Sequence, residues 1–329
     1  MLFNIIALLA AASLTQAVVL PARQVSDGSK CIDPPQRIEW RQLEPAQQKS
    51  YIDAVLCLKT KPSRIGLRSL FDDFPHVHFQ VASSIHNQAT FLPWHRYFTK
   101  CYFDALSECG YSGPGTYWDW TLDHESLLAS PVMSSTTGFG GNGDPNRSEY
   151  NAPTDQTLPC VDSGPFKDLR PEYLPNSPTE MTEGGHCFFR QVAEANEPEA
   201  WNIMKDTLTP EYVANQQKLE TFAKFAPDLE ASPHGTIHAS LGGEMNPTTS
   251  PNEPLFFLHH PQIDRLWWTW QQQNLEKRVA DYSGMHRPWG STSFVPASMN
   301  DTLNMLGVAD DVLVKDVMST TGPVLCYRY

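Results

Sequence analysis

Apolar residues recur at helical spacing in several separate stretches of the chain. After Pro45, which suits the first position of a helix, Tyr51, Val55 and Leu58 repeat along one face. The same period returns in later stretches and predicts a mainly α-helical protein. Helices are expected from Pro45, around 70–81, from about 93 to 109, over 210–225, near 234–241 and over 261–274.

The stretch from Ser130 to Pro198 interrupts this pattern. It is dense in Gly, Pro, Ser, Asn and Asp, which favour turns over regular elements. We therefore expect a long, irregular surface excursion. A disulfide between Cys160 and Cys187 would pin it to the rest of the protein.

The charge of the chain limits its partners. The net charge of the 329 residues is −13 at pH 7. Nucleic acids and anionic membranes are bound through clustered Lys and Arg, so neither is an expected partner. A small uncharged or weakly cationic substrate suits this charge better, and we expect a monomer or a weak homo-oligomer.

The first residues have the pattern of a secretory signal peptide. An apolar run, IIALLAAASL, precedes the small residue Ala17 at a suitable cleavage position. We assign 1–17 to the signal peptide, 18–26 to a short propeptide or flexible N-terminus, and 27–329 to a single domain of a secreted protein.

Cysteine and asparagine patterns fit secretion. Seven cysteines predict disulfides with at least one thiol left over, and a bond between Cys31 and Cys326 would tie the two ends together. Asn146 and Asn300 begin Asn-Arg-Ser and Asn-Asp-Thr, which are N-glycosylation acceptors in form.

Six histidines fall into two groups of three that can hold a pair of metal ions without carboxylate ligands. Imidazole suits Cu, Zn, Fe and Ni alike, so ligand type alone does not choose the metal. Both groups must converge on one site, and an antiparallel four-helix bundle with ligands on facing helices is the simplest architecture. The groups are His78, His86 and His95, and His234, His238 and His260.

Three common metal sites do not fit this pattern. A zinc protease has Glu directly after the first His of an H-x-x-x-H pair, where this chain has Gly235. Di-iron bundles use Glu-x-x-His pairs, and single non-haem iron takes two His and one carboxylate. Paired three-His copper, which indicates dioxygen chemistry, remains. Spacing alone leaves His76 open as an alternative to His78, and His259 as an alternative to His260.

Several motifs resemble those of type 3 copper proteins of the tyrosinase and catechol oxidase family, in particular its short secreted fungal members. The resemblance spans roughly Arg37 to Tyr329, and its two histidine motifs are highly specific. The matching motifs are FLPWHRYF, YWDW, TGFGGNG, HGTIH with the following GGEM, PLFFLHHPQIDRLWW and the closing CYRY.

The resemblance implies a dicopper centre with the six histidines named above as ligands. It favours His78 over His76 and His260 over His259, which becomes a supporting residue. The two copper ions would bind O2 as peroxide and oxidise a phenolic substrate to an o-quinone, with water as the final product of oxygen.

Three further residues would support this chemistry. Glu230 matches the family's water-holding Glu, which would remove the phenolic proton as a general base. Phe256 resembles the aromatic residue that packs against the copper-bound rings. Asp264, one turn after His260, is a candidate to hold that ring, with a salt bridge to Arg96 or Arg265 as its alternative role.

Three departures from the family pattern bear on the substrate. Gly235 stands where relatives that hydroxylate monophenols efficiently often have Asn, so hydroxylation is expected to be weak. Ser84 replaces a cysteine that forms a thioether to histidine in many relatives, so that crosslink is not expected. The closing tyrosine motif resembles the end of the family's catalytic domain, and we expect no lid domain after it, with Arg37 or Arg41 packing on its tyrosines.

These features predict a secreted oxidase of o-diphenols or o-aminophenols, with weaker monophenol o-hydroxylation. Gly235, Pro247 and Thr248 are expected to control substrate entry, because the segment 245–254 connects two ligand-bearing helices. One alternative is a tailoring phenol oxidase of secondary metabolism. The other belongs to a different class, a hemocyanin-like oxygen carrier.

Overall fold

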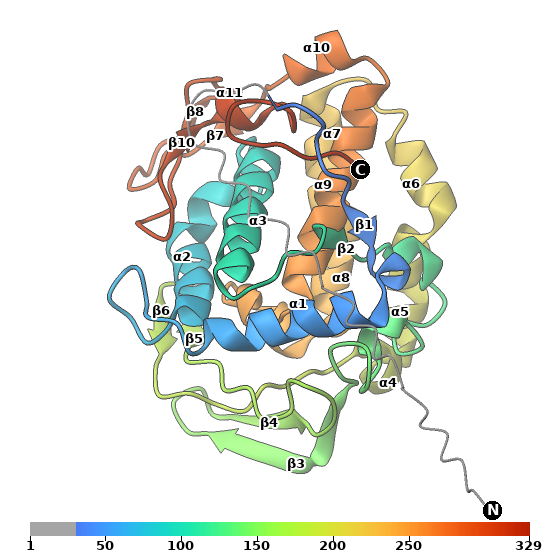
Figure 1. Ribbon diagram of the computed structural model, residues 1–329, viewed down its shortest axis with the longest axis vertical. Coiled ribbons are helices and arrows are strands. Elements are labelled where there is room, and N and C mark those ends of the chain that lie inside the picture. Colours follow the sequence, from blue (N-terminus) through green and yellow to red (C-terminus); the bar gives the residue numbers. More distant parts are fainter. Residues whose placement is uncertain (1–30) are drawn as a thin grey trace, which may run out of the picture.

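The computed structural model describes residues 31–329 and confirms a mainly helical protein (Figure 1). The predicted signal peptide and propeptide lie outside the described residues. The α-helices are α1 (Pro45–Leu58), α2 (Leu70–Ile85), α3 (Phe91–Glu108), α4 (Ala193–Asn196), α5 (Pro198–Met204), α6 (Pro210–Gln216), α7 (Phe222–Leu229), α8 (Gly235–Leu241), α9 (Phe256–Gln272), α10 (Leu275–Val279) and α11 (Val314–Val317).

Short strands pair in twos around the helices. The parallel pair is β1 (Ile38–Glu39) with β2 (Thr116–Tyr117). The antiparallel pairs are β3 (Gly143–Asn151) with β4 (Gln156–Val161), β5 (Leu174–Ser177) with β6 (Glu180–Thr182), β7 (Met285–His286) with β8 (Val295–Pro296), and β9 (Thr302–Leu303) with β10 (Val312–Leu313).

Local sequence signals set the ends of the first helices. α1 starts at Pro45 behind a capping box between Glu44 and Gln47, and its apolar stripe is buried. In α2, the Ser69 side chain accepts a hydrogen bond from the backbone N–H of Asp72 at the N-terminus. Past α3, Gly110 adopts a φ of +86°, a conformation that glycine adopts without strain.

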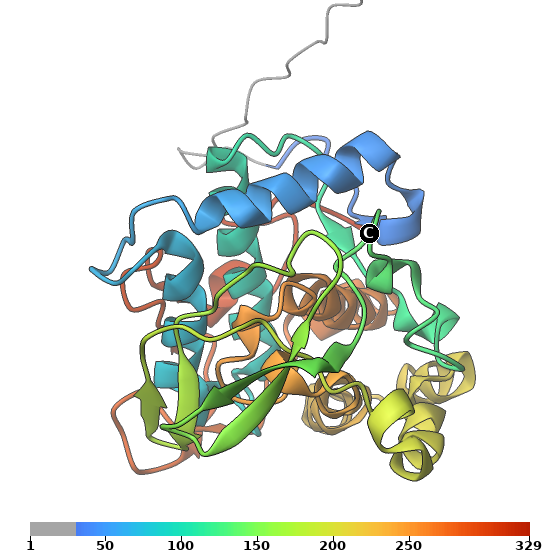
Figure 2. The same ribbon diagram turned by 90° about the horizontal axis from the view of Figure 1, so that it is seen from below.

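The helices that carry the histidines form the centre of the molecule. α2, α3 and α9 lie side by side, with α8 beside α9 and α1 crossing α2 and α3 (Figures 1 and 2). Their buried side chains belong to one large apolar cluster rich in aromatic rings, including the fully buried Trp94, Trp267 and Trp270. This packing fixes the helices against one another and thereby places the histidines.

Three predicted elements differ from the structure. α2 continues to Ile85, so His86 caps the helix instead of following in a loop. The expected helix over 210–225 is two helices, α6 and α7. α9 begins at Phe256, ahead of the expected start at Pro261, because 256–258 are buried in the core and their packing outweighs the hydrogen bond that proline cannot donate.

The excursion from Ser130 to Pro198 is not devoid of regular structure. It contains the β3–β4 and β5–β6 hairpins, which lie on one side of the helices (Figure 2). Turn-forming residues are frequent in short hairpins as well as in irregular loops, so composition did not distinguish the two.

Three disulfides hold the described residues together. Cys31–Cys326 joins the two ends and Cys160–Cys187 pins the excursion, as predicted, while Cys57–Cys109 links α1 to the end of α3. Cys101 on α3 is the free thiol among the described residues, and it is buried. No helix in 31–329 combines the length and apolar character that crossing a bilayer requires.

Candidate metal centre

The first histidine group forms where α2 turns into α3. His78 lies on α2, His86 caps its C-terminus and His95 lies in the second turn of α3. One ring nitrogen from each lies within 4.8 Å of the others. His76, two residues before His78, lies outside this group and packs against the ring of Tyr173.

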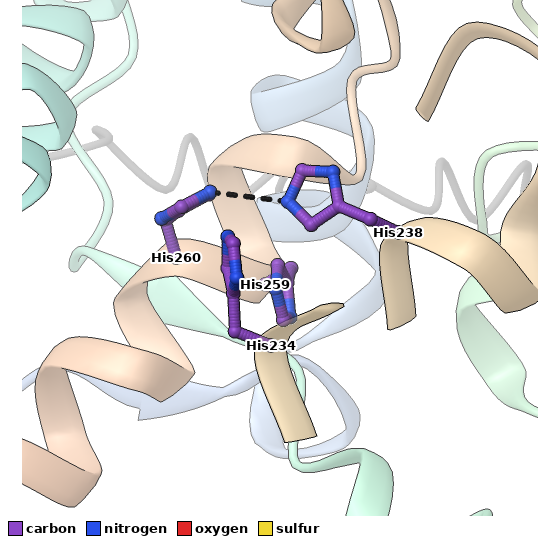
Figure 3. A group of neighbouring side chains, drawn as sticks. All are labelled: His234, His238, His259 and His260. Carbon is purple, nitrogen blue, oxygen red and sulfur yellow. Dashed lines mark hydrogen bonds between the residues drawn. The ribbon is translucent and has the colours of Figure 1, made fainter. Parts of the chain in front are cut away.

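The second group comes from α8 and α9. His234 ends a π-helical turn, Glu230–His234, and His238 follows one turn later on α8, so both rings project from the same face. His260 lies near the start of α9, beside His259 (Figure 3). One nitrogen from each of these four rings lies within 4.8 Å of the others.

The two groups lie next to each other. The rings of His95 and His260, one from each group, stack with centroids 4.3 Å apart and an interplanar angle of 10°. The rings of His86 and His234 are 6.4 Å apart. All six predicted histidines therefore meet in one place, although they come from segments more than 130 residues apart.

Backbone carbonyl groups orient five of the six rings. Each of these rings places Nδ1 within 2.6–3.0 Å of a carbonyl oxygen, so Nδ1 carries the proton and donates it. A neutral imidazole has one N–H, and Nε2 therefore keeps its lone pair. The pairs are His78 with Thr248, His86 with Ala82, His95 with Phe91, His234 with Glu230, and His238 with Met245.

These lone pairs converge. The Nε2 atoms of His78 and His95 are 3.3 Å apart, although neither has a proton to donate. The Nε2 atoms of His238 and His260 are 3.4 Å apart (Figure 3). Two nitrogens that each lie about 2.0–2.1 Å from one first-row metal ion are about 3.3–3.6 Å apart, so both spacings suit a shared ion.

The charge state of the rings also suits metal binding. Burial lowers the pKa of His86 and of His238 to about 4. Burial, with the neighbouring imidazoles, lowers the pKa of His78, His95, His234 and His260 well below its usual value. The rings are therefore neutral at pH 7, which is the form that binds a metal. Among the described residues neither group includes a carboxylate or a thiol, so the residues present fit a pair of copper ions.

His260 and His259 are held less firmly than the other rings. Nδ1 of His260 and both ring nitrogens of His259 are buried without a hydrogen-bond partner. Nε2 of His234 is also unpartnered, as expected of an atom that faces a metal. A buried polar atom without a partner costs about 1–3 kcal/mol, so this side of the site is costly to the protein without an ion.

Asp264 does not hold the ring of His260, contrary to the prediction. Its carboxylate forms the salt bridge to Arg96 that was the alternative role. It accepts hydrogen bonds from the side chains of Arg37, Arg96, Tyr327 and Tyr329. Because these groups fill the acceptor sites of the carboxylate, it is not available to an imidazole.

This buried network joins both ends of the described chain to α9. The guanidinium of Arg37 lies 3.6 Å from the centroid of the Tyr327 ring, so Arg37, and not Arg41, packs on the closing tyrosines. Burial alone would raise the pKa of Asp264, but Arg96 and Arg37 outweigh burial and lower it. Asp264 therefore supports α9 from behind the site.

Phe256 contacts a histidine of each group. Its ring packs 4.1 Å from that of His260 and 5.3 Å from that of His78, between centroids, so it contacts both groups. The ring is fully buried. It gives one side of the histidine cluster an apolar wall.

Glu230 lies beside both histidine groups. Its Oε1 accepts the backbone N–H of Asn87, the residue after His86, at 2.6 Å, while its own carbonyl holds His234. Burial raises the pKa of Glu230 to about 8, and the Asn87 hydrogen bond opposes this rise only in part. The carboxyl group is therefore poised to exchange a proton near neutral pH.

The three proposed entry residues differ in their relation to the histidine groups. Gly235 and Pro247 are half-buried, and Thr248 supplies the carbonyl that orients His78. A Cβ on Gly235 would meet only the Glu230 carbonyl, at 3.5 Å, so a side chain fits there. Pro247 also lines a cavity of about 440 Å³.

Sequence reasoning did not find the carbonyl partners of the histidines. Any residue type supplies a carbonyl, so Met245 and Thr248 gave no signal in the sequence. The backbone amide of Asn87 was missed for the same reason. Asn146 and Asn300, the predicted glycosylation acceptors, are both exposed.

Known proteins resemble this chain along most of its length. The family model described as the common central domain of tyrosinase matches residues 68–273. The tyrosinase-like protein phomQ2 of Diaporthe leptostromiformis is 36% identical over 307 residues, covering 92% of this chain and 75% of that protein. The N-acetyl-6-hydroxytryptophan oxidase ivoB of Emericella nidulans is 30% identical, covering 89% of this chain and 91% of its own length.

A solved structure shows the same fold. The polyphenol oxidase from Thermothelomyces thermophila, solved as a variant, has a TM-score of 0.76 and 29% sequence identity, covering 91% of this chain and 90% of that one. Together with the histidine geometry, these matches settle the family. The chain belongs to the tyrosinase family.

Proposed function

We propose that this tyrosinase-family chain is a secreted dicopper oxidase that uses O2 to oxidise o-diphenols or o-aminophenols to o-quinones or quinone imines. The observation that carries the proposal is the convergence of imidazole nitrogens in two adjacent groups, with Nε2 atoms 3.3 and 3.4 Å apart. α2, α3, α8 and α9 would serve as the four-helix bundle that carries the metals. Residues 27–329 would form one catalytic domain.

The ligands in this proposal are the three histidines of each group. His78, His86 and His95 would hold one copper ion, and His234, His238 and His260 the other. The bound pair would supply two electrons to O2 and contact the phenolic oxygen. Over a full cycle, two o-diphenols each lose two electrons and two protons, and one O2 becomes two waters.

Glu230 would serve as the general base. It is the carboxylate placed beside both groups, it is 8% exposed, and its pKa lies at about 8. The positive charge of the two bound copper ions would lower this pKa toward neutrality, where a base is effective. Asn87 fixes one oxygen, and the other would take the phenolic proton through an ordered water.

Substrate choice would depend on the residues around the second group. Gly235 offers no side-chain amide to hold that water, which favours diphenols, whose protons are lost more readily, over monophenols. His259 would support the ligands from behind, and Pro247 and Thr248 would border the entrance. We therefore expect monophenol o-hydroxylation to be weaker than diphenol oxidation.

A tailoring oxidase with one natural substrate is the second candidate. It is favoured by the similarity to ivoB, an N-acetyl-6-hydroxytryptophan oxidase that aligns with most of this chain. A hemocyanin-like carrier is disfavoured because it would need the histidine cluster to be shielded, whereas His86, Gly235 and His238 are half-buried.

Oxygen uptake by the copper-loaded protein separates these functions. We expect two coppers per chain and sustained uptake with several diphenols and aminophenols. Uptake confined to one compound would support the tailoring role, and reversible binding without consumption would support a carrier. A copper content of one per chain would refute the dicopper proposal.

A further inference from the structure

One short segment orients an imidazole in each histidine group. The carbonyl of Met245 holds His238 at 2.7 Å, and the carbonyl of Thr248 holds His78 at 2.6 Å. Both carbonyls belong to the connection between α8 and α9, and we name its residues 244–253 the carbonyl strap. The strap is thus shared between the two halves of the site.

The other oriented rings do not depend on a separate segment. His86, His95 and His234 each bond to the carbonyl four residues earlier, within their own helix or turn. Their orientation follows from helix formation itself. His78 and His238 differ, because their direction depends on where the strap lies.

Two buried carboxylates fix the ends of the strap. Glu244 at the start and Glu253 at the end are both 0% exposed. Oε1 of Glu244 accepts from Nε2 of His186 at 2.6 Å. Glu253 is held bidentately by Arg190, with both N–O distances at 2.7 Å.

Both partners come from one stretch of the excursion. His186 and Arg190 flank Cys187, whose disulfide to Cys160 pins that stretch. Arg190 also donates to the carbonyls of Gly140 and Gly141, so it is fixed independently of the strap. The segment 186–190 therefore contacts the strap at both ends, and we name it the anchor.

The backbones of the two segments are also in close contact. The N–H of Glu244 donates to the carbonyl of Phe189 at 3.2 Å. A Cβ added to Gly243, which has a φ of +48°, would lie 2.4 Å from that same carbonyl oxygen. Asn252 bridges the strap internally by donating to Glu244 at 3.0 Å. The strap therefore has little freedom to shift.

Stability alone does not explain this arrangement. Burying a charged pair removes both groups from water, and apolar replacements of similar size are often as stable or more stable. Two such pairs at the two ends of one segment instead fix its position. Fixed carbonyl partners keep metal-binding imidazoles in one direction and tautomer.

We propose that His186, Glu244, Arg190 and Glu253 are positioning residues that set the carbonyl strap and thereby orient one ligand of each metal site at once. This inference rests on the proposed dicopper function and extends it. It predicts that the two copper sites are coupled through the strap, so that loosening one end weakens both.

The test compares Glu244→Gln with Glu108→Gln. Glutamine keeps the size of Glu244 but loses the charge that pairs with His186. Glu108 pairs with Arg64 at the exposed end of α3, away from both the strap and the anchor, so its variant is the control. Copper(I) affinity is measured by chelator competition for each of the two equivalents. The Nδ1–H signals of 15N-labelled histidines are recorded on the diamagnetic copper(I) protein.

We expect Glu244→Gln to weaken both equivalents by about 10- to 100-fold, as loss of the groups behind a metal ligand does elsewhere. The Nδ1–H signals of His78 and His238 should shift or disappear while those of His86 and His95 stay in place. Glu108→Gln should change neither quantity.

Other outcomes overturn the inference. Weakening of one equivalent alone would show that the strap does not couple the sites, and an equal shift of all five signals would indicate general loosening. If Glu244→Gln does not fold, His186→Asn removes the same hydrogen bond from the other side and is judged by the same criteria. Wild-type protein that binds fewer than two coppers would refute the proposed function, whereas two coppers with unaffected variants would refute this inference alone.

Discussion

The two histidine groups hold their rings in different ways. In the first group every ring has a carbonyl partner at Nδ1. In the second group His234 and His238 have one, while Nδ1 of His260 and both nitrogens of the adjacent His259 have none. The first group is therefore set by the fold, whereas the second relies more on a bound ion to fix its geometry.

The residues around the two groups also differ. Gly235 and Pro247 lie beside the second group, and Glu230 reaches from it toward Asn87 of the first. In the first group His78 and His95 contact the buried rings of Phe98 and Trp94, while His86 is half-buried, as His238 is in the second group. Burial therefore does not separate the two groups, and the difference between them lies in how their rings are held.

Removing one ligand from each group tests this difference with the largest expected effect. His95→Gln and His260→Gln should each lower the copper content from two to one and abolish catechol-dependent oxygen uptake. In His95→Gln the remaining copper is bound by the second group, whose rings are held less firmly, and in His260→Gln it is bound by the first group. The copper in His95→Gln should therefore bind at least about tenfold more weakly. Chelator competition measures both affinities.

His124→Gln is the control for the ligand variants. His124 lies outside both groups and is partly exposed, so its loss should leave two coppers bound. Equal residual affinities in the two ligand variants would contradict the difference between the groups.

Glu230 joins the two groups, and its removal should have the next largest effect. Glu230→Gln keeps the hydrogen-bonding shape but loses the base, so kcat for catechol should fall by about 10²–10⁴ with two coppers retained. The measurement is steady-state oxygen uptake together with copper content. Glu220→Gln, at an exposed position ten residues earlier, should behave as wild type. An unchanged kcat in Glu230→Gln would exclude this residue as the base.

The sequence predicted the parts of the site that rest on local patterns. Helical periodicity located α1 and α3, and the family resemblance selected the histidines that the structure brings together. His76 and His78 are equally plausible ligands by spacing, yet one faces Tyr173 and the other the cluster. Only the direction of the helix face distinguishes them, and that direction depends on packing.

The parts that could not be predicted depend on contacts between distant segments. Asp264 stands one turn after His260 and seemed suited to hold it, but Arg37 and Arg96, far away in the sequence, claim its oxygens. The carbonyls of Met245 and Thr248 have no residue-type signature. Because Phe256 packs in the core, α9 likewise starts five residues before Pro261, which marked its expected start.

The hydrogen bond between His186 and Glu244 lies at the strap, which contacts both histidine groups. Its loss should therefore change the stability of the protein without separating one group from the other. Burial alone would lower the pKa of His186, but the Glu244 carboxylate beside it outweighs burial and raises the pKa. Burial also raises the pKa of Glu244. The folded protein therefore binds protons at this pair more tightly than the unfolded chain, and the stability from His186 is present below its ordinary pKa of 6.5 and is lost as pH rises through the higher folded value.

His186→Gln should therefore lower the free energy of unfolding most at acid pH. We expect a loss of about 1.5–3 kcal/mol at pH 6 that shrinks as the pH rises above 6.5. Denaturant titration of the metal-free protein at several pH values measures it. His124→Gln, at a partly exposed ion pair, should cost well under about 1 kcal/mol at every pH. A loss that grows with pH would show that the sign of the His186 shift is wrong.

The smallest expected effect tests access to the second group alone. Pro247 is half-buried within the strap, next to Thr248, whose carbonyl orients His78. Pro247→Phe adds bulk at the proposed entrance, so kcat/KM for 4-tert-butylcatechol should fall by about tenfold and that for catechol by about twofold, which is the range of discrimination a pocket wall provides. Pro296→Phe, at an exposed position on β8, should change neither. An equal loss for both substrates would mean that the larger side chain displaced the strap and, with it, His78. Pro247 would then support the first group and would not control entry to the second.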